Sequence, residues 1–127
     1  MFRWGRRAGA TRVREAVLDV VSMLESGKAA LVSTVPRGRV EPPPLAEGLF
    51  AFEAALREAR RIMPAWRRPE TNDLWSRCLD AINESARMAE RLRLEAPRLD
   101  YESMVFVIGD IIAPLEVFAE AERRVTA

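Results

Sequence analysis

Residues 45–63 read LAEGLFAFEAALREARRIM, and this stretch decides the fold class. Its apolar side chains recur at alternating spacings of four and three residues, which is the period of one face of an α-helix. These side chains are Leu45, Leu49, Phe52, Leu56, Ala59 and Met63. Pro44 stands where proline suits a helix start, and Pro64 stands where proline stops or kinks a helix. The stretch therefore predicts an amphipathic helix over 45–63.

Three further segments carry the same period. The first helix is expected to begin near Arg12, with Thr11 as its N-cap, and to end at Ser26 and Gly27, where glycine suits the position after a helix. A third helix follows a cap at residues 71–73 and ends by Pro97. Asp100 caps a fourth helix, whose apolar stripe stays in phase through Pro114 to residue 119.

The predicted fourth helix has an alternative interpretation near its start and a proline in its interior. Val, Phe and Ile are strand formers, so Met104 to Ile108 has a rival interpretation as a strand that turns at Gly109. Helix is preferred, because no second convincing strand is present to pair with it. Pro114 would free the carbonyl of Asp110 from the helical hydrogen bonds, so we expect the last helix to be kinked there.

The elements predict an all-α fold, a four-helix antiparallel bundle with a long proline-containing first connection. That connection covers 28–44 and includes the run Pro42 to Pro44, although 29–35 has the composition of a short extended piece. Residues 1–10 lack periodicity and contain two glycines, which predicts a flexible basic N-terminal arm. Residues 11–127 then form a single helical-bundle domain.

Composition excludes much active-site chemistry. The chain has one Cys and no His among its 127 residues, which rules out an intrachain disulfide, Cys/His zinc sites and histidine general bases. The acidic spacing Glu70 to Asp73 lies at a helix start, where acids are commonplace because they complement the helix dipole. We therefore expect no catalytic site, no metal and no cofactor. A hydrolase with an all-carboxylate metal site is the third function class considered, and the spacing of the acids disfavours it.

The same composition bears on location. Charged residues interrupt the apolar stretch that follows the basic N-terminus, so no secretory leader is expected. The most apolar segment, Met104 to Val117, is broken by Asp110, Pro114 and Glu116 and falls short of the ~20 residues that a membrane span needs. We expect a cytoplasmic protein that does not enter a membrane.

The N-terminal arm is the first candidate binding site. Arg3, Arg6 and Arg7 surround Trp4, and Arg67 and Arg68 form a second basic pair in the turn before the third helix. Arginine side chains neutralise phosphates, and an aromatic ring can stack on a base. The formal net charge is only +1, so binding of nucleic acid or another polyanion is the less favoured function.

The last helix is the second candidate site. Phe106, Val107 and Val117 flank its core stripe, so its apolar surface is wider than a peripheral helix needs. The excess predicts a self-association interface and a homodimer. Asp110 and Pro114 mark a possible functional kink in the same helix.

The sequence also divides by charge. Residues 1–63 hold 11 basic and 7 acidic side chains, whereas 64–127 hold 9 and 12, and such opposite halves suit association between copies of the chain. The function expected from sequence is therefore self-association, with a further protein partner also possible, rather than catalysis.

Overall fold

The computed structural model describes the backbone of residues 2–127 and the side chains of residues 9–127. Its α-helices are α1 (Phe2–Val32), α2 (Leu45–Ile62), α3 (Asn72–Glu95), α4 (Tyr101–Ile112) and α5 (Val117–Thr126). Short 3-10 helices lie between them, namely η1 (Met63–Trp66), η2 (Pro69–Thr71), η3 (Ala96–Arg98) and η4 (Ala113–Glu116). The all-α fold class is confirmed. The rival strand is wrong, because Met104 to Ile108 lies inside α4.

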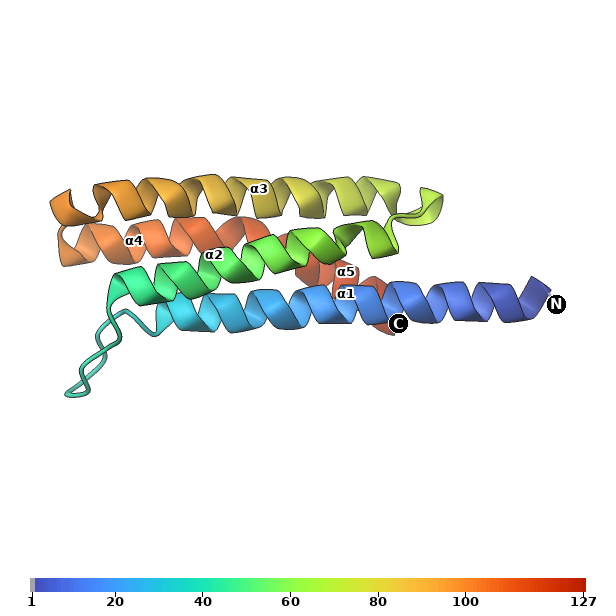
Figure 1. Ribbon diagram of the computed structural model, residues 1–127, viewed down its shortest axis with the longest axis horizontal. Helices are drawn as coiled ribbons and strands as arrows, with labels where there is room; N and C mark the ends of the chain where they lie inside the picture. The colour runs from blue at the N-terminus through green and yellow to red at the C-terminus, as the bar shows by residue number, and fades with distance from the viewer. Residues whose placement is uncertain (1) are drawn as a thin grey trace.

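The helices enclose one shared core. Contacts join α1 to α2, α2 to α3, α3 to α4, and α5 back to α1. In Figure 1 the chain runs along the bundle in α1 and returns in α2, and α3 and α4 repeat this course beside them. The apolar stripe of α2 faces inward as predicted, since Leu49, Phe52, Leu56 and Ala59 are all buried. The exposed face of α2 carries charged side chains and also Phe50.

Helix α1 is longer than the sequence predicts at both ends. It does not stop at Gly27 but continues to Val32. Gly27 is buried, and a Cβ atom there would lie 2.6 Å from the Cβ of Ala55 in α2. The glycine therefore serves the close approach of two helices rather than a helix end. The predicted end at Ser26 and Gly27 is wrong for this reason.

The start of α1 differs as well. Residues 2–10, predicted as an arm without periodicity, continue the helix, and its first turns extend beyond the ends of the other helices (Figure 1). Adding residues to an existing helix needs no new nucleation, so the two glycines in this segment, at about 1 kcal/mol each, do not suffice to break it. The mobility of this segment stays a prediction.

The connection between α1 and α2 covers 33–44 and contains neither helix nor ladder-forming strand. Its start is fixed by Thr34, which is buried and donates its hydroxyl to the carbonyl of Leu31 at 2.7 Å. The loop turns at Gly38, whose φ of +63° is a conformation that glycine adopts without steric cost. The short extended piece considered for 29–35 is wrong, because α1 includes most of it.

The last helical region is interrupted where Pro114 stands. Asp100 caps α4 as predicted, and its carboxylate accepts the backbone N–H of Ser103 at 2.8 Å. The helix does not run unbroken through Pro114, since α4 ends at Ile112 and η4 precedes α5. Beside the break, buried Ser85 of α3 donates its hydroxyl to the carbonyl of Ile111 at 2.7 Å. The structure thus contains a change of helix type here, and a kink angle stays a prediction.

Two glycines give opposite expectations for stability. Replacing Gly48 by alanine should lower the free energy of unfolding by about 1–3 kcal/mol, because the added Cβ would overlap the Cγ2 of Thr34 and lie 2.9 Å from the carbonyl oxygen of Ala30. Thr34 cannot rotate away without losing its buried hydrogen bond. Urea unfolding followed by circular dichroism measures the change.

Gly109 is the matched control. It lies inside α4, and a Cβ atom there meets nothing within 4 Å. In the monomeric chain, Gly109→Ala should therefore raise the free energy of unfolding by about 0.5–1 kcal/mol, because alanine loses less backbone entropy in a helix. Equal effects of the two substitutions would contradict the close packing at Gly48.

Candidate functional site

The outer face of α4 presents apolar side chains to solvent. We define this face by the exposed residues Tyr101, Glu102, Val105, Phe106, Gly109 and Asp110. Phe106 is 76% exposed, Tyr101 51% and Val105 38%. These positions lie opposite Ile108 and Ile111, which the helical period turns into the core. No Lys or Arg occurs in α4, so no long basic side chain covers the apolar atoms.

The three residues predicted as an interface occupy two different environments. Val107 and Val117 are partly buried and pack against the core of their own chain. Phe106, in contrast, is exposed to solvent. The wide apolar stripe is thus partly used within the molecule, because the last helical region contacts α3 and also returns to α1. An interface built on α4 would center on Phe106, with Tyr101 and Val105 beside it.

Asp110 and Pro114, singled out as a possible functional kink, do not form a common site. Asp110 is exposed on the outer face of α4. Pro114 is partly buried at the start of η4, where it interrupts the helix. The structure therefore gives Pro114 a place in the fold and gives Asp110 a place on the candidate interface.

Of the predicted basic residues, the structure describes the side chains of Arg67 and Arg68. The side chains of Arg3, Trp4, Arg6 and Arg7 lie outside the part of the structure that is described. The guanidinium of Arg67 lies over the ring of Trp75, 4.6 Å from its centroid, which is a cation–π contact.

Arg68, next in the chain, has a different environment. It is exposed and donates to the carbonyl of Arg67 at 2.8 Å. It also lines a groove that Arg67 does not reach. The two arginines of the turn therefore do not act as one pair.

The aromatic side chains near this turn are structural. Trp66 is buried and its indole N–H donates to the sulfur of Met63 at 3.3 Å. The indole N–H of Trp75 donates to the backbone carbonyl of Met63 at 2.7 Å. Both rings close the end of the bundle, and neither is free to stack on a ligand.

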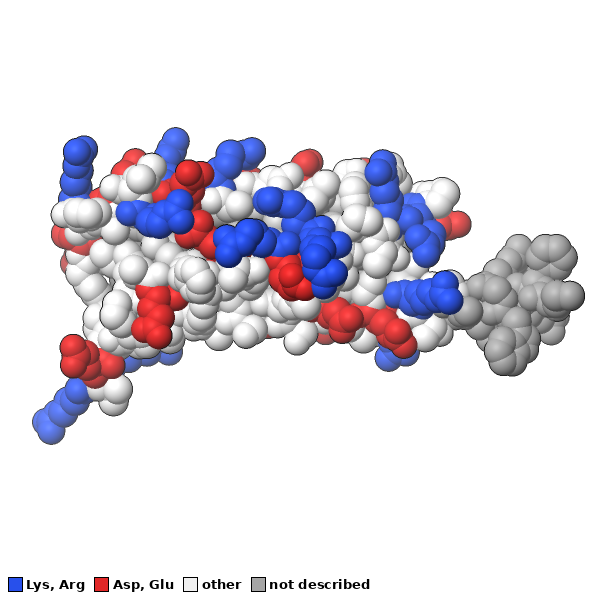
Figure 2. Space-filling view, viewed as in Figure 1, with Lys and Arg blue, Asp and Glu red and all other residues white. Residues whose placement is uncertain are grey.

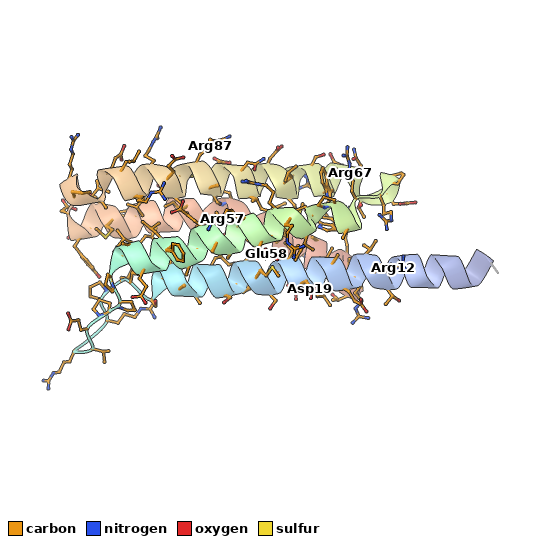
Figure 3. All side chains as sticks on the ribbon, viewed as in Figure 1. Arg12, Asp19, Arg57, Glu58, Arg67 and Arg87 are labelled. Atoms are coloured by element: carbon orange, nitrogen blue, oxygen red, sulfur yellow. The ribbon has the colours of Figure 1, made fainter. Side chains whose placement is uncertain are left out.

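Arginines also gather over α2 and α3, as the view in Figure 2 shows, but acidic side chains lie among them. Arg93 of α3 reaches Glu53 of α2 at 3.2 Å, and Arg61 pairs with Glu58 within α2. Arg57 and Arg87, labelled in Figure 3, have no carboxylate within 4.0 Å among the described side chains. This mixture of charges does not form a continuous surface for a polyanion.

The one cysteine of the chain lies in an environment that lowers its reactivity. Cys78 is fully buried in α3, and this burial raises the pKa of its thiol to about 12, outweighing the opposing effect of Arg77. A thiol of this kind is not a nucleophile at neutral pH. Within residues 9–127, no three Cys, Asp or Glu side chains are grouped so as to hold a metal ion.

None of the helices in the described part combines the length with the apolar character that crossing a membrane requires. Comparison with family models, with curated proteins and with solved structures finds no match to this chain.

Proposed function

We propose that this protein acts by protein–protein interaction, and that the outer face of α4 docks onto the same face of a second copy. The observation that carries the proposal is the exposure of Phe106, at 76%, beside two other apolar side chains on a helix without basic residues. Aromatic residues that lie near the centre of an interface contribute much of its binding energy. No catalytic function is proposed.

The shape of the face supports a helix-to-helix contact. Nothing lies within 4 Å of where a Cβ of Gly109 would be, so the backbone of α4 is open to close approach at this point. Phe106 stands about one turn before Gly109 on the same face, since residues three apart are neighbours on a helix. In a symmetric contact, Phe106 of one copy fills the space above Gly109 of the other.

The charges on the outer face of α4 determine how dimer formation should depend on salt. Glu102 and Asp110 are both acidic and exposed, so two copies of α4 bring like charges together. Added salt screens this repulsion and should strengthen the dimer, or leave it unchanged. Association driven by the opposite charges of the two halves of the chain would instead weaken as salt is added.

A substitution of Phe106 tests the proposal. Phe106→Glu should convert a dimer into a monomer, because it removes the central apolar side chain and adds another negative charge. Size-exclusion chromatography with light scattering measures the mass, which is 14.4 kDa for one chain. The variant should melt as a folded protein, since position 106 makes little contact with the core.

Phe50→Glu is the matched control. Phe50 is also a phenylalanine on a helix surface, 72% exposed, but it lies on α2. This variant should keep the wild-type mass. If both variants dissociate the dimer, or neither does, the outer face of α4 is not the interface.

Binding of nucleic acid or another polyanion is the second candidate, using the N-terminal arm with Arg67 and Arg68. One observation supports it, namely that Arg68 is exposed and lies free of carboxylates among the described side chains. Arg67, held against Trp75, is less suited to the task. Binding that falls steeply with salt, and that is lost when residues 1–10 are deleted, would favour this candidate over self-association.

A further inference from the structure

Three arginines from distant parts of the sequence line one groove at the end of the bundle. Arg14 comes from α1, Arg68 from the turn between η1 and η2, and Arg124 from α5. The groove has a volume of about 760 Å³, which is within the range of small-molecule sites. Figure 3 labels Arg12 and Arg67, which are chain neighbours of lining residues, toward one end of the bundle.

The charge balance of this groove favours an anion. Like charges that share a groove repel one another unless an opposite charge lies between them. Among the described lining residues Glu70 alone is acidic, and Arg124 also has a partner outside the groove, Glu120 at 3.3 Å. Arg14 and Arg68 have no carboxylate within 4.0 Å among the described side chains. The lining as a whole is positive.

The turn that carries Arg68 is held in place by Thr71. The Thr71 hydroxyl accepts the backbone N–H of Arg68 at 3.1 Å and lies 3.0 Å from the carbonyl of Trp66, to which it can donate. Trp66 is itself buried in the end of the core. Arg68 uses one side-chain N–H on the carbonyl of Arg67, and a guanidinium has five such donors. The remaining donors are therefore presented from a fixed backbone.

The rest of the lining is apolar or small. Val13 of α1 and Val125 of α5 contribute partly buried apolar side chains. Gly9 and Ala10 of α1 also line the groove and add little side-chain bulk. Thr11 adds an exposed hydroxyl. A ligand that suits this lining has an anionic group for the arginines and a less polar part for the two valines.

We propose that this groove binds a small phosphate-bearing organic molecule, with Arg14 and Arg68 as its principal phosphate ligands and Arg124 as a third. Guanidinium groups donate paired hydrogen bonds to phosphate oxygens, and such charged hydrogen bonds are the strong ones. The site is independent of the outer face of α4, because none of its lining residues belongs to that helix.

Calorimetric titration of the 127-residue chain with inorganic pyrophosphate and with ATP tests the site. We expect saturable binding of one ligand per chain, with ATP bound more tightly because its base and sugar cover the valines. Arg68→Ala and Arg14→Ala should each weaken binding by roughly tenfold or more, the loss typical of a hydrogen bond to a charged group. Arg68→Lys should be intermediate, because lysine keeps the charge but not the paired geometry.

Arg87→Ala is the control. Arg87 is an exposed arginine of α3 that is not among the residues of the groove and has no carboxylate partner among the described side chains. The Arg87→Ala variant should bind pyrophosphate and ATP with the affinities of the wild type. Equal weakening by Arg87→Ala and Arg68→Ala would overturn the site in favour of diffuse attraction.

Two other outcomes would overturn the proposal. The first is no heat of binding for either ligand at millimolar concentration. The second is tight binding of single-stranded oligodeoxythymidine that survives Arg14→Ala and Arg68→Ala, which would assign the affinity to a nucleic-acid surface elsewhere. The mass of the protein, followed in the same samples, reports separately on self-association.

Discussion

Replacing Phe52 by alanine is expected to lower the free energy of unfolding by about 3–5 kcal/mol. Phe52 is fully buried at the middle of α2, and its ring lies against α1 where Gly27 brings the two helices together. Alanine would leave a cavity that the surrounding helices cannot close, because this contact fixes their separation. The total free energy of unfolding of a domain of this size is roughly 5–15 kcal/mol, so the expected loss is a large share of it.

Phe50→Ala supplies the control for this prediction. Phe50 lies two residues away on the same helix but is 72% exposed, so its replacement should change the free energy of unfolding by less than about 0.5 kcal/mol. Urea titrations of both variants give the two values. A loss at position 50 as large as that at position 52 would mean that the assigned faces of α2 are wrong.

The thiol of Cys78 should be almost inert in the folded protein. Its side chain is fully buried, and a thiol reagent can reach it only when the helix bundle opens. We expect modification at about pH 8 to be at least ~10³-fold slower in buffer than in denaturant, in keeping with the population of open molecules. The reaction can be followed with a chromogenic disulfide reagent.

A variant whose single cysteine lies at an exposed position serves as the control for the activity of the reagent. Ser26 is exposed on α1, so the variant Ser26→Cys in a Cys78→Ala background should react in buffer at the rate of a free thiol. Fast reaction of Cys78 in the native protein would show that α3 does not bury this position.

The same burial gives a pH dependence of stability. The pKa of Cys78 is raised to about 12 by burial, whereas the unfolded thiol has the ordinary value of 9.0. The folded state therefore keeps the proton that the unfolded state loses. The resulting stability is fully present below about pH 9 and falls by about 1.4 kcal/mol per pH unit as the pH rises toward 12.

Comparison with Cys78→Ala isolates this contribution. Every other ionisable group is common to both proteins. The difference in slope between the wild type and the variant should therefore equal the contribution of one proton. Equal slopes would contradict the raised pKa.

Local periodicity was sufficient to predict α2 and its inward face, because the apolar side chains of this helix form one buried stripe. It could not predict the end of α1. A glycine at position 27 suits a helix end and suits a close helix contact equally well, and only the position of Ala55 distinguishes the two. That position is set by the packing of α2 on α1.

Sequence was less informative about the candidate sites. Flanking apolar residues on α4 indicated surplus surface, but Val107 and Val117 contact their own core, because the last helical region lies against both α3 and α1. Of the basic groove, the sequence indicated Arg68 alone, and it placed this residue in a pair with Arg67. Arg14, Arg68 and Arg124 are far apart along the chain, and only the folded bundle brings them to one end.

Sedimentation velocity of the wild-type chain over about a hundredfold range of concentration tests the proposed self-association most directly. We expect a species of twice the 14.4 kDa of one chain, favoured by concentration and not weakened by salt. Phe106→Glu should sediment as a monomer throughout that range. A wild-type chain that sediments as a folded monomer at every concentration would contradict the proposal that the outer face of α4 joins two copies.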